Sequence, residues 1–387
     1  MKSIEETQIK DISEILTKYD TLIKARTDCH LGYPYNLSNQ FPMQLLSFIQ
    51  YSINNLGDPF IDSNYGIHSR PFEIAVLNWF ANLWQIPKDE YWGYVGCSGT
   101  EGNFSGLLIA RDNLPDGVLY ASEESHYSVF KACHLYKIAY EKVKCNEDGT
   151  MNINSFSECL EKHKDEPAIV NANVGTTMKG GIDNIDQIIS ILKLKQKKFY
   201  VHCDSALSGI IDLNLDLNFK KEIDSISVSG HKFLGCPFPC GVIITRKRLI
   251  EKLGNDIDYI GSRDSTIMGS RNGHAPIFMW YLLVLKGKKG LLKDYESCVE
   301  NAKILEKSLF GKRNGITVVL KKPRCEDFIK KWQLACTNDL CHVVIMPNVT
   351  KAVLEKFIEH YKSIIIISPD CFSNDINIQT QCLDFSI

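Results

Sequence analysis

The sequence has little net charge of either sign. Its 44 lysines and arginines nearly balance its 46 aspartates and glutamates, which gives a formal net charge of -2 and a sequence pI of about 6.6. Nucleic acids and anionic membranes attract proteins through a positive surface field, so neither is an expected partner. The balance favours a protein that acts on a small molecule.

Long hydrophobic runs are also missing. The longest apolar run, Ile277 to Leu285, lies between Pro276 and Lys286 and is too short to cross a bilayer, so it favours a buried helix. The N-terminal stretch MKSIEETQIK is a polar helical pattern that lacks the apolar segment of a secretory signal. We therefore expect a cytoplasmic protein with reduced thiols and no transmembrane segment.

Ligands with the spacing of a metal site are absent as well. The 14 cysteines are scattered along the chain, and three residues separate Cys236 from Cys240. A zinc site would need two further ligands at comparable spacing, and no second pair of cysteines or histidines follows. We predict buried structural thiols at these positions and no bound metal.

The length and the periodicity of the chain predict an α/β fold. A chain of 387 residues can form one large domain with a smaller one beside it. From about residue 72, helical and strand-like segments alternate, which predicts a mostly parallel sheet covered by helices on both faces. The helical segments are 72–84, 126–136 and 183–195, and the strand-like runs are 118–122, 167–174, 199–204, 224–230 and 241–247.

The two ends of the chain have a different character. Residues 5–25 predict a helix, and the turn-rich, aromatic segment HLGYPYNLSNQFP after it is expected to cross a surface or a partner chain. Beyond Pro276 the pattern predicts helices at 277–286, 292–310 and 350–361, and strands at 316–320, 342–347 and 364–367. We divide the chain into an N-terminal helix and extended segment (1–50), a large α/β domain (51–275) and a small C-terminal α+β domain (276–387).

Two strand-like runs end in residues suited to chemistry. In SVSGHKFLGCPFPCG, Lys232 directly follows a strand-like run, and a desolvated lysine has a lowered pKa that suits imine formation with a carbonyl. A surface lysine after a strand explains this segment equally well. Asp204 ends FYVHCD and precedes small residues that leave room for a flat ring, so its carboxylate could pair with a protonated pyridine nitrogen. The alternative is an aspartate that caps the next helix.

Two further segments lie at expected strand ends. GYVGCSGTEGNFSG is a glycine-rich turn that opens a helix, where Gly99 and Thr100 could donate hydrogen bonds to a phosphate. A nicotinamide dinucleotide site is the weaker hypothesis, because the glycine spacing differs from G-x-G-x-x-G and no clear βαβ unit begins there. In SEESHYSVFKAC, His126 could lie flat on a cofactor ring or simply cap the helix.

Taken together, the motifs GTEGN, ESHYSVFKA, CDSAL, SVSGHKF, CPFPCGV and SRNGHAP resemble a known family. They are similar to those of the fold-type I, pyridoxal-phosphate-dependent group II amino-acid decarboxylases, in particular the plant-type histidine and serine decarboxylases. The resemblance is dense over residues 28–285 and resumes in KKWQLAC and HVVIMPNVT. It implies a large domain with a mostly parallel seven-stranded sheet, a smaller α+β domain, and pyridoxal 5'-phosphate as the cofactor.

The resemblance also implies roles for individual residues. Lys232 would be the Schiff-base lysine, Asp204 the partner of the pyridine nitrogen, and His126 the histidine that stacks on the ring. The other cofactor contacts that it implies are Gly99, Thr100, Thr176, Ala206, Ser229, His231 and, from the neighbouring subunit, Ser270. The residues expected at the substrate end are Tyr33, Tyr35, Asn64, Tyr65 and His68. The resemblance also implies a homodimer with shared active sites.

Two departures from the family pattern bear on the substrate and on the small domain. The chain has DSALSG where serine-specific relatives usually read D-G-A-L-F-G, so Ser208 either makes space for a larger substrate or faces away from the pocket. The stretch before ITVVLKKP is shorter than in relatives, which leaves the register of that strand open.

Our hypothesis at this point is decarboxylation of L-histidine to histamine, with L-serine decarboxylation to ethanolamine second. Two further hypotheses are an aldehyde synthase that uses the same cofactor and a catalytically silent binding homologue.

Overall fold

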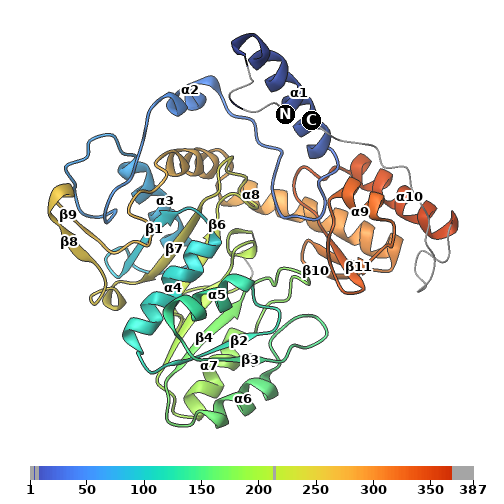
Figure 1. Ribbon diagram of the computed structural model, residues 1–387. Helices are drawn as coiled ribbons and strands as arrows, with labels where there is room; N and C mark the ends of the chain where they lie inside the picture. The colour runs from blue at the N-terminus through green and yellow to red at the C-terminus, as the bar shows by residue number, and fades with distance from the viewer. Residues whose placement is uncertain (1–3, 5–7, 212–214, 368–387) are drawn as a thin grey trace.

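The computed structural model describes residue 4 and residues 8–211 and 215–367. Within these ranges a seven-stranded sheet forms the centre of the larger part (Figure 1), in the order β1-β7-β6-β5-β4-β2-β3. The strands are β1 (Tyr91–Gly96), β2 (Val118–Ser122), β3 (Tyr140–Val143), β4 (Ala168–Asn173), β5 (Phe199–Asp204), β6 (Ser225–Ser229) and β7 (Gly241–Arg246). Only β7 runs antiparallel to its neighbours in this sheet. The predicted mostly parallel seven-stranded sheet is confirmed.

Helices cover both faces of this sheet, as its alternating side chains require. Leu119 and Ala121 of β2 belong to a buried cluster with α4 and α5, whereas Val118 and Tyr120 face the cluster that includes α3, α6 and α7. Each fully buried aliphatic side chain of this kind contributes about 1.5–3 kcal/mol to folding. These helices are α3 (Arg70–Leu83), α4 (Gly99–Asn113), α5 (Tyr127–Tyr136), α6 (Ile153–Lys162) and α7 (Ile185–Leu194).

Strand β1 was not among the predicted strands, because its two glycines made it resemble a turn. A Cβ atom on Gly93 would lie 2.3 Å from the carbonyl oxygen of Ile243, so only glycine allows β1 to approach β7 this closely. β1 leads directly into the glycine-rich turn and α4. It pairs antiparallel with β7 and is not hydrogen-bonded to β2, so it does not open a dinucleotide-binding βαβ unit.

A long helix connects the large part with the small one. Helix α8 (His274–Leu309) is a single element that bends at Gly287, whose φ of 55° and ψ of -178° are not helical, and it replaces the two predicted helices. One cluster of buried side chains runs along α8 through both parts, from Ala275 to Leu305. The predicted boundary at residue 275 therefore falls in the first turn of a helix that both parts share, and the division at residues 50 and 275 stays a prediction.

The small part contains a four-stranded antiparallel sheet in the order β10-β11-β13-β12, at the right of Figure 1. Its elements are β10 (Lys312–Asn314), β11 (Thr317–Lys321), α9 (Glu326–Trp332), β12 (Ala335–Thr337), β13 (Leu340–Val344) and α10 (Lys351–Ile367). Asn314 pairs with Thr317 across Gly315 and Ile316, so the shortened stretch is a tight hairpin with a defined register.

The predicted strand at 364–367 is wrong, because Ile364 to Ile367 continue α10. A short apolar run of β-branched residues suits a strand or a buried helix equally well by periodicity. Here the helix has already started, and Leu354, Phe357 and Tyr361 recur at helical spacing against the core. The run therefore extends an existing helix.

The remaining elements are short or lie at the N-terminus. They are η1 (Ile9–Asp11), α1 (Ile12–Thr27), α2 (Met43–Leu46), η2 (Ser47–Gln50), η3 (Ser208–Ile210), η4 (Lys247–Leu249), β8 (Asn255–Ile257), η5 (Asp258–Ile260) and β9 (Ser262–Asp264). Helix α1 corresponds to the predicted N-terminal helix, although residues 5–7 lie outside the described ranges. Every helix within the described ranges is too short or too polar to cross a membrane.

Residues 31–39, which we call the bridging segment, connect the small part with the large one. At one end the amide of Val344 in β13 donates to the carbonyl of Leu31 at 2.9 Å. At the other end the amide of Asn36 donates to the carbonyl of Lys232 at 3.0 Å. The predicted crossing of a surface is thus observed, and the segment passes over the carboxyl ends of β5 and β6.

Candidate active site

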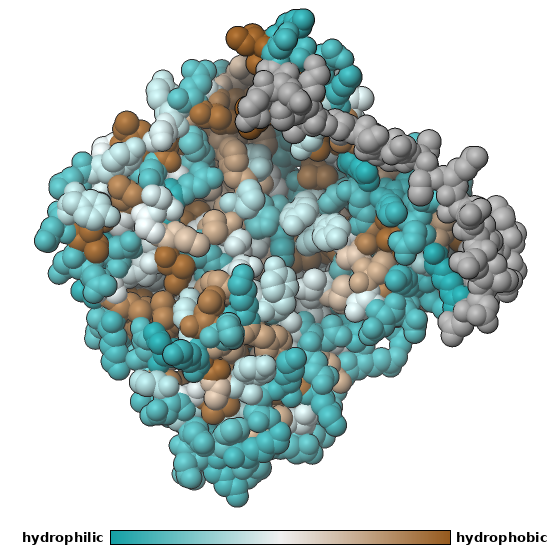
Figure 2. Space-filling view, in the orientation of Figure 1, coloured by the Kyte–Doolittle hydropathy of each residue, from teal (hydrophilic) through white to brown (hydrophobic). Residues whose placement is uncertain are grey.

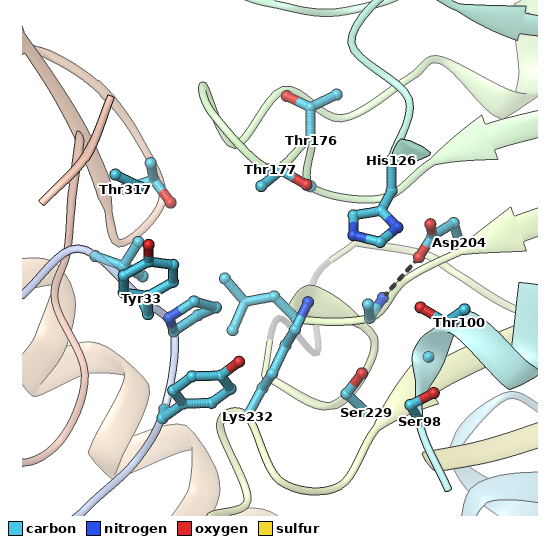
Figure 3. A pocket seen from close by; sticks show the side chains of 18 of the residues that line it. Tyr33, Ser98, Thr100, His126, Thr176, Thr177, Asp204, Ser229, Lys232 and Thr317 are labelled. Carbon is cyan, nitrogen blue, oxygen red and sulfur yellow. Dashed lines mark hydrogen bonds between the residues drawn. The ribbon is translucent and has the colours of Figure 1, made fainter. Parts of the chain in front are cut away.

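A pocket with a volume of about 260 Å³ lies beneath the bridging segment. Its floor comes from the ends of β4, β5 and β6, one side comes from the start of α4, and the opposite side comes from β11, β12 and β13 of the small part. Figure 3 shows Thr317 and Tyr33 at one end of this pocket and Ser98 and Thr100 at the other, with Lys232 between them. This is the sheet edge at which ligands of α/β proteins bind.

Lys232 extends into the middle of the pocket from the loop after β6 (Figure 3). Burial lowers the pKa of its ammonium group, and the negative charge of Asp204 opposes that shift in part. A lysine in such a site is more easily deprotonated, which makes its amine a better nucleophile toward a carbonyl carbon.

Asp204 is the last residue of β5 and is buried, with 7% of its surface exposed. Its Oδ2 atom accepts a hydrogen bond from Nδ2 of Asn103 at 2.7 Å, and its Oδ1 atom accepts one from the amide of Ala206 at 3.2 Å. These donors hold the carboxylate in one orientation toward the pocket.

His126 reaches the pocket from the start of α5 and also caps that helix, so the two roles left open by the sequence coexist. Its Nδ1 atom lies 2.7 Å from Oγ of Ser128 and accepts the Ser128 amide at 3.3 Å, which leaves the ring proton of the neutral form on Nε2. Burial lowers the pKa of His126; the charge of Asp204 opposes this shift, and that of Lys232 adds to it.

The far end of the pocket is suited to an anion. The N-terminus of α4 points at it, with Ser98 as the N-cap that accepts a hydrogen bond from the Glu101 amide at 3.2 Å. Gly99 keeps this end open, because a Cβ atom on it would lie 2.7 Å from Oγ of Ser229 and 3.2 Å from Cβ of Ala206. The side chains of Ser229 and Thr100 complete this end, whereas the ring of His231 lies beside Tyr35, with centroids 5.7 Å apart.

Comparison with known proteins decides what this site is for. The pyridoxal-dependent decarboxylase conserved domain matches residues 68–326. The chain belongs to this family. This match and the similar relatives confirm that the protein is a pyridoxal-phosphate-dependent amino-acid decarboxylase. It belongs to the group that the sequence motifs resemble.

Individual relatives extend this result. The decarboxylase is 50% identical over 363 residues to serine decarboxylase 2 of Oryza sativa subsp. japonica, covering 90% of this chain and 77% of that one. It is 41% identical over 400 residues to histidine decarboxylase of Solanum lycopersicum, covering 97% of both. The fold matches that of L-methionine decarboxylase from Streptomyces sp. 590 with a TM-score of 0.87, at 22% identity and over 94% of this chain and 97% of that one.

The residues of the pocket fit pyridoxal phosphate. The cofactor requires a nucleophilic amine, an acid near its ring nitrogen, a flat slot and a phosphate site. Lys232 and Asp204 supply the first two, and the small residues Gly99 and Ala206 keep the slot open. The start of α4 supplies the fourth.

A chain of hydrogen bonds, in which each group donates to the next, leads from the protein interior to Asp204. Tyr200 donates to Ser225 at 2.9 Å, and Oγ of Ser225 lies 2.8 Å from Nδ1 of His202. Ser225 therefore donates to Nδ1, and the His202 proton on Nε2 donates to Oδ1 of Asn103 at 3.0 Å. Burial lowers the pKa of His202 to about 4, which keeps this ring neutral.

The same chain fixes the orientation of Asn103. Since its Oδ1 atom accepts from His202 and from Ser227 at 3.1 Å, its amino group must face the other way. That group donates to Asp204 and, at 3.0 Å, to Oγ of Ser128, whose own proton is then available to Nδ1 of His126. Asn103 thus orients both polar groups that face the cofactor site.

The structure brings most of the predicted site residues together. Those that line the pocket are Tyr33, Tyr35, Gly99, Thr100, His126, Thr176, Asp204, Ala206, Ser229, His231 and Lys232. Thr176 also accepts a hydrogen bond from the Gly181 amide at 2.9 Å through its hydroxyl, which closes the loop after β4.

Four predicted residues lie elsewhere: Asn64, Tyr65, His68 and Ser270 are not part of the pocket of this chain. Tyr65 donates to the carbonyl of Ser52 at 3.1 Å, and Ser270 accepts from Asn54 at 3.1 Å. For Ser270 the resemblance had implied a contact across a subunit boundary. For the other three, the expected substrate contact is not made within a single chain, because their loop packs against η5, where the Asn64 amide donates to the carbonyl of Ile260 at 2.8 Å.

Sequence reasoning missed Asn103 and His202, and it left Ser208 open. Asn103 lies one helical turn after Gly99, so both are on the face of α4 toward the sheet. This spacing could have identified Asn103 from the sequence. Ser208 does not line this pocket but a smaller cavity that adjoins it and shares Thr176, Leu207 and Thr317 with it. Ser208 therefore does not border the space in front of Lys232.

Replacing Asn103 with aspartate tests the support of Asp204. The new carboxylate can still accept from His202 and Ser227, but it would face Asp204 where the amide now donates, and two carboxylates so close cannot both stay ionised. We expect the dissociation constant for pyridoxal phosphate to rise at least tenfold, measured by absorbance titration of the apoenzyme. Asn255→Asp, on the exposed strand β8, is the matched control. A cofactor affinity of Asn103→Asp within twofold of the wild type would refute this role.

Proposed function

We propose that this decarboxylase removes the α-carboxylate of L-serine and produces ethanolamine and carbon dioxide. The observation that carries the proposal is the higher identity to rice serine decarboxylase 2, 50% against 41% for tomato histidine decarboxylase. Two further rice serine decarboxylases, at 48% and 47% identity, support the same choice. The pocket that one chain forms has a volume of about 260 Å³, just below the roughly 300–1,000 Å³ that is usual for ligand sites, which agrees with a small substrate.

In this proposal each group of pocket residues has a separate role. Lys232 binds the cofactor through its amine, Asp204 holds the proton of the ring nitrogen, and His126 and Ala206 contact opposite faces of the ring. Gly99, Thr100 and Ser229 hold the phosphate, and Thr176 lies near the ring hydroxyl. Bound pyridoxal phosphate supplies a ring that delocalises the electron pair left when carbon dioxide departs. Tyr33 and Tyr35, whose rings stack with centroids 6.4 Å apart, limit the access of water from above.

L-Histidine is the second candidate substrate. The similarity to tomato histidine decarboxylase over 97% of both chains favours it. The preference for histidine that came from the sequence depended on Ser208, and that side chain lines the neighbouring cavity.

A substrate panel tests the proposed reaction. The purified holoenzyme is incubated with each common amino acid, and carbon dioxide, amine, ammonia and peroxide are measured. We expect kcat/KM for L-serine to exceed that for L-histidine at least tenfold, because an imidazole needs more space and other hydrogen-bond partners than a hydroxymethyl group. Lys232→Ala is the control and should form no amine. Histamine as the main product would overturn the serine assignment, and ammonia with peroxide would indicate an aldehyde synthase. Wild-type protein that binds the cofactor and turns over no amino acid would indicate a silent homologue.

We also propose a homodimer in which each subunit completes the site of the other. Four exposed apolar side chains, Phe48 and Ile49 of η2 and Tyr51 and Ile67 of the loops after it, lie on a stretch that hydrogen bonds join to the segment 270–274. Figure 2 shows apolar residues that interrupt the hydrophilic surface over the blue loops at the left of Figure 1. Exposed apolar clusters of this kind mark association surfaces. The four predicted site residues outside the pocket, Asn64, Tyr65, His68 and Ser270, lie in the same loops.

Complementation between two inactive variants tests this arrangement. Lys232→Ala lacks the amine, and Ser270→Asp places a negative charge where a phosphate would bind, so each homodimer should be inactive. When they are mixed and allowed to exchange subunits, about a quarter of the wild-type activity should return, because half of the dimers are mixed and each has one intact site. Light scattering verifies that both variants remain dimeric. Mixtures that stay inactive despite subunit exchange would show that each site is built from one chain.

A cytoplasmic location completes the proposal. The twelve cysteines in the part of the chain that the structure describes are all free thiols, and seven of them are buried. Free thiols are typical of a reducing compartment.

A further inference from the structure

His342 occupies an unusual position in the wall of the pocket. It lies on β13 with 2% of its surface exposed, and both His342 and Val344, which share one face of that strand, line the pocket. Val344 pairs with Thr317 of β11. In Figure 3 Thr317 lies at the end of the pocket opposite Ser98 and Thr100. His342 therefore belongs to the end where the substrate binds, away from the phosphate end.

Both ring nitrogens of His342 face backbone carbonyl oxygens. The Nε2 atom lies 2.8 Å from the carbonyl oxygen of Gly32, and the Nδ1 atom lies 3.0 Å from that of Met178. A carbonyl oxygen only accepts hydrogen bonds, and a neutral imidazole has a single N–H donor. A ring that is protonated on both nitrogens makes both hydrogen bonds, whereas a neutral ring leaves one lone pair against an oxygen.

These two carbonyls are fixed by their surroundings, so they cannot turn away from the ring. Gly32 packs against the start of β12, where a Cβ atom would lie 2.1 Å from the carbonyl oxygen of Gln333. Met178 is in the loop that the Thr176 hydroxyl closes, and Asn314 donates to the next carbonyl, that of Lys179, at 2.8 Å. The chain thus holds two acceptors on opposite sides of one imidazole.

A protonated His342 would be a buried cation without a carboxylate beside it. Among the residues that the structure describes, the histidine with carboxylate ion pairs is His163, at the end of α6. The residues that line the pocket include no arginine, and burial lowers the pKa of both His126 and His231. Beyond Lys232 in the middle of the pocket, a protonated His342 would therefore be the cation that an anion meets at the substrate end.

We propose that His342 is held as an imidazolium and that its charge attracts and orients the α-carboxylate of the amino-acid substrate. The inference rests on the proposed function only in that the substrate is an amino acid, and it applies to serine and histidine alike. His342 is a specificity-determining residue in this scheme. It favours ligands that carry a carboxylate over the product amine, which helps the amine to leave after carbon dioxide is lost.

The test compares a substrate with its own product in the variant His342→Gln. Glutamine removes the charge but keeps an N–H donor group and an acceptor at similar reach. The amino acid that the wild-type holoenzyme decarboxylates most rapidly serves as one probe, and the amine that it forms serves as the other. We expect KM for the amino acid to rise at least tenfold, the inhibition constant of the amine to stay within twofold, and the dissociation constant for pyridoxal phosphate to stay unchanged.

The control and the opposing outcomes are equally specific. His134→Gln, an exposed histidine of α5, should change none of these constants. Equal weakening of amino acid and amine would mean that His342 acts through packing alone, and no change in either would also overturn the proposal. If His342→Gln does not fold, nitrogen-15 NMR of the wild-type ring decides: a signal from an unprotonated ring nitrogen of His342 would contradict the imidazolium. Because the probe is the amino acid found to react, failure of the serine assignment leaves this test intact.

Discussion

The hydrogen bond between Asn103 and Asp204 is the constraint on which the rest of the site depends. A carboxylate at the end of a buried strand is costly unless donors hold it, and here the cost is offset by the Asn103 amide at 2.7 Å and the Ala206 amide at 3.2 Å. The neutral ring of His202 sets the direction of the Asn103 amide. A negative charge can therefore persist beside Lys232, in a pocket that disfavours charge.

The parallel sheet explains why residues far apart in the sequence meet at this point. Asn173, Asp204 and Ser227 are paired across β4, β5 and β6, so the loops after these strands open on the same edge. Helix α4 is directed at that edge by β1, which can lie against β7 because Gly93 has no side chain. The small part and the bridging segment then close the side that the sheet leaves open.

The sequence predicted the parts of this arrangement that depend on local pattern. The strands β2, β4, β5, β6 and β7 coincide closely with apolar runs, and Lys232, Asp204 and His126 were found because each follows or ends a strand. Strand β1 and the end of α10 were misjudged, because glycines and isoleucines at those places suit more than one structure by periodicity. Tertiary packing decides between them.

The contacts behind the site were beyond the reach of pattern alone. His342 is 310 residues away from Gly32 in the chain, and neither residue has a motif that points to the other. The direction of Ser208 depends on the short helix after β5, which places it toward the neighbouring cavity. Asn64, Tyr65, His68 and Ser270 could be recognised as site residues by family resemblance, but not assigned to one chain or its partner.

The most direct test of the central claim is to locate the covalent bond to the cofactor. The holoenzyme is reduced with borohydride, digested, and analysed by mass spectrometry for a peptide that carries the pyridoxyl group. We expect the label on Lys232, next to the carboxylate that Asn103 holds. A label on any other lysine, or a cofactor released unmodified, would contradict the site described for this decarboxylase.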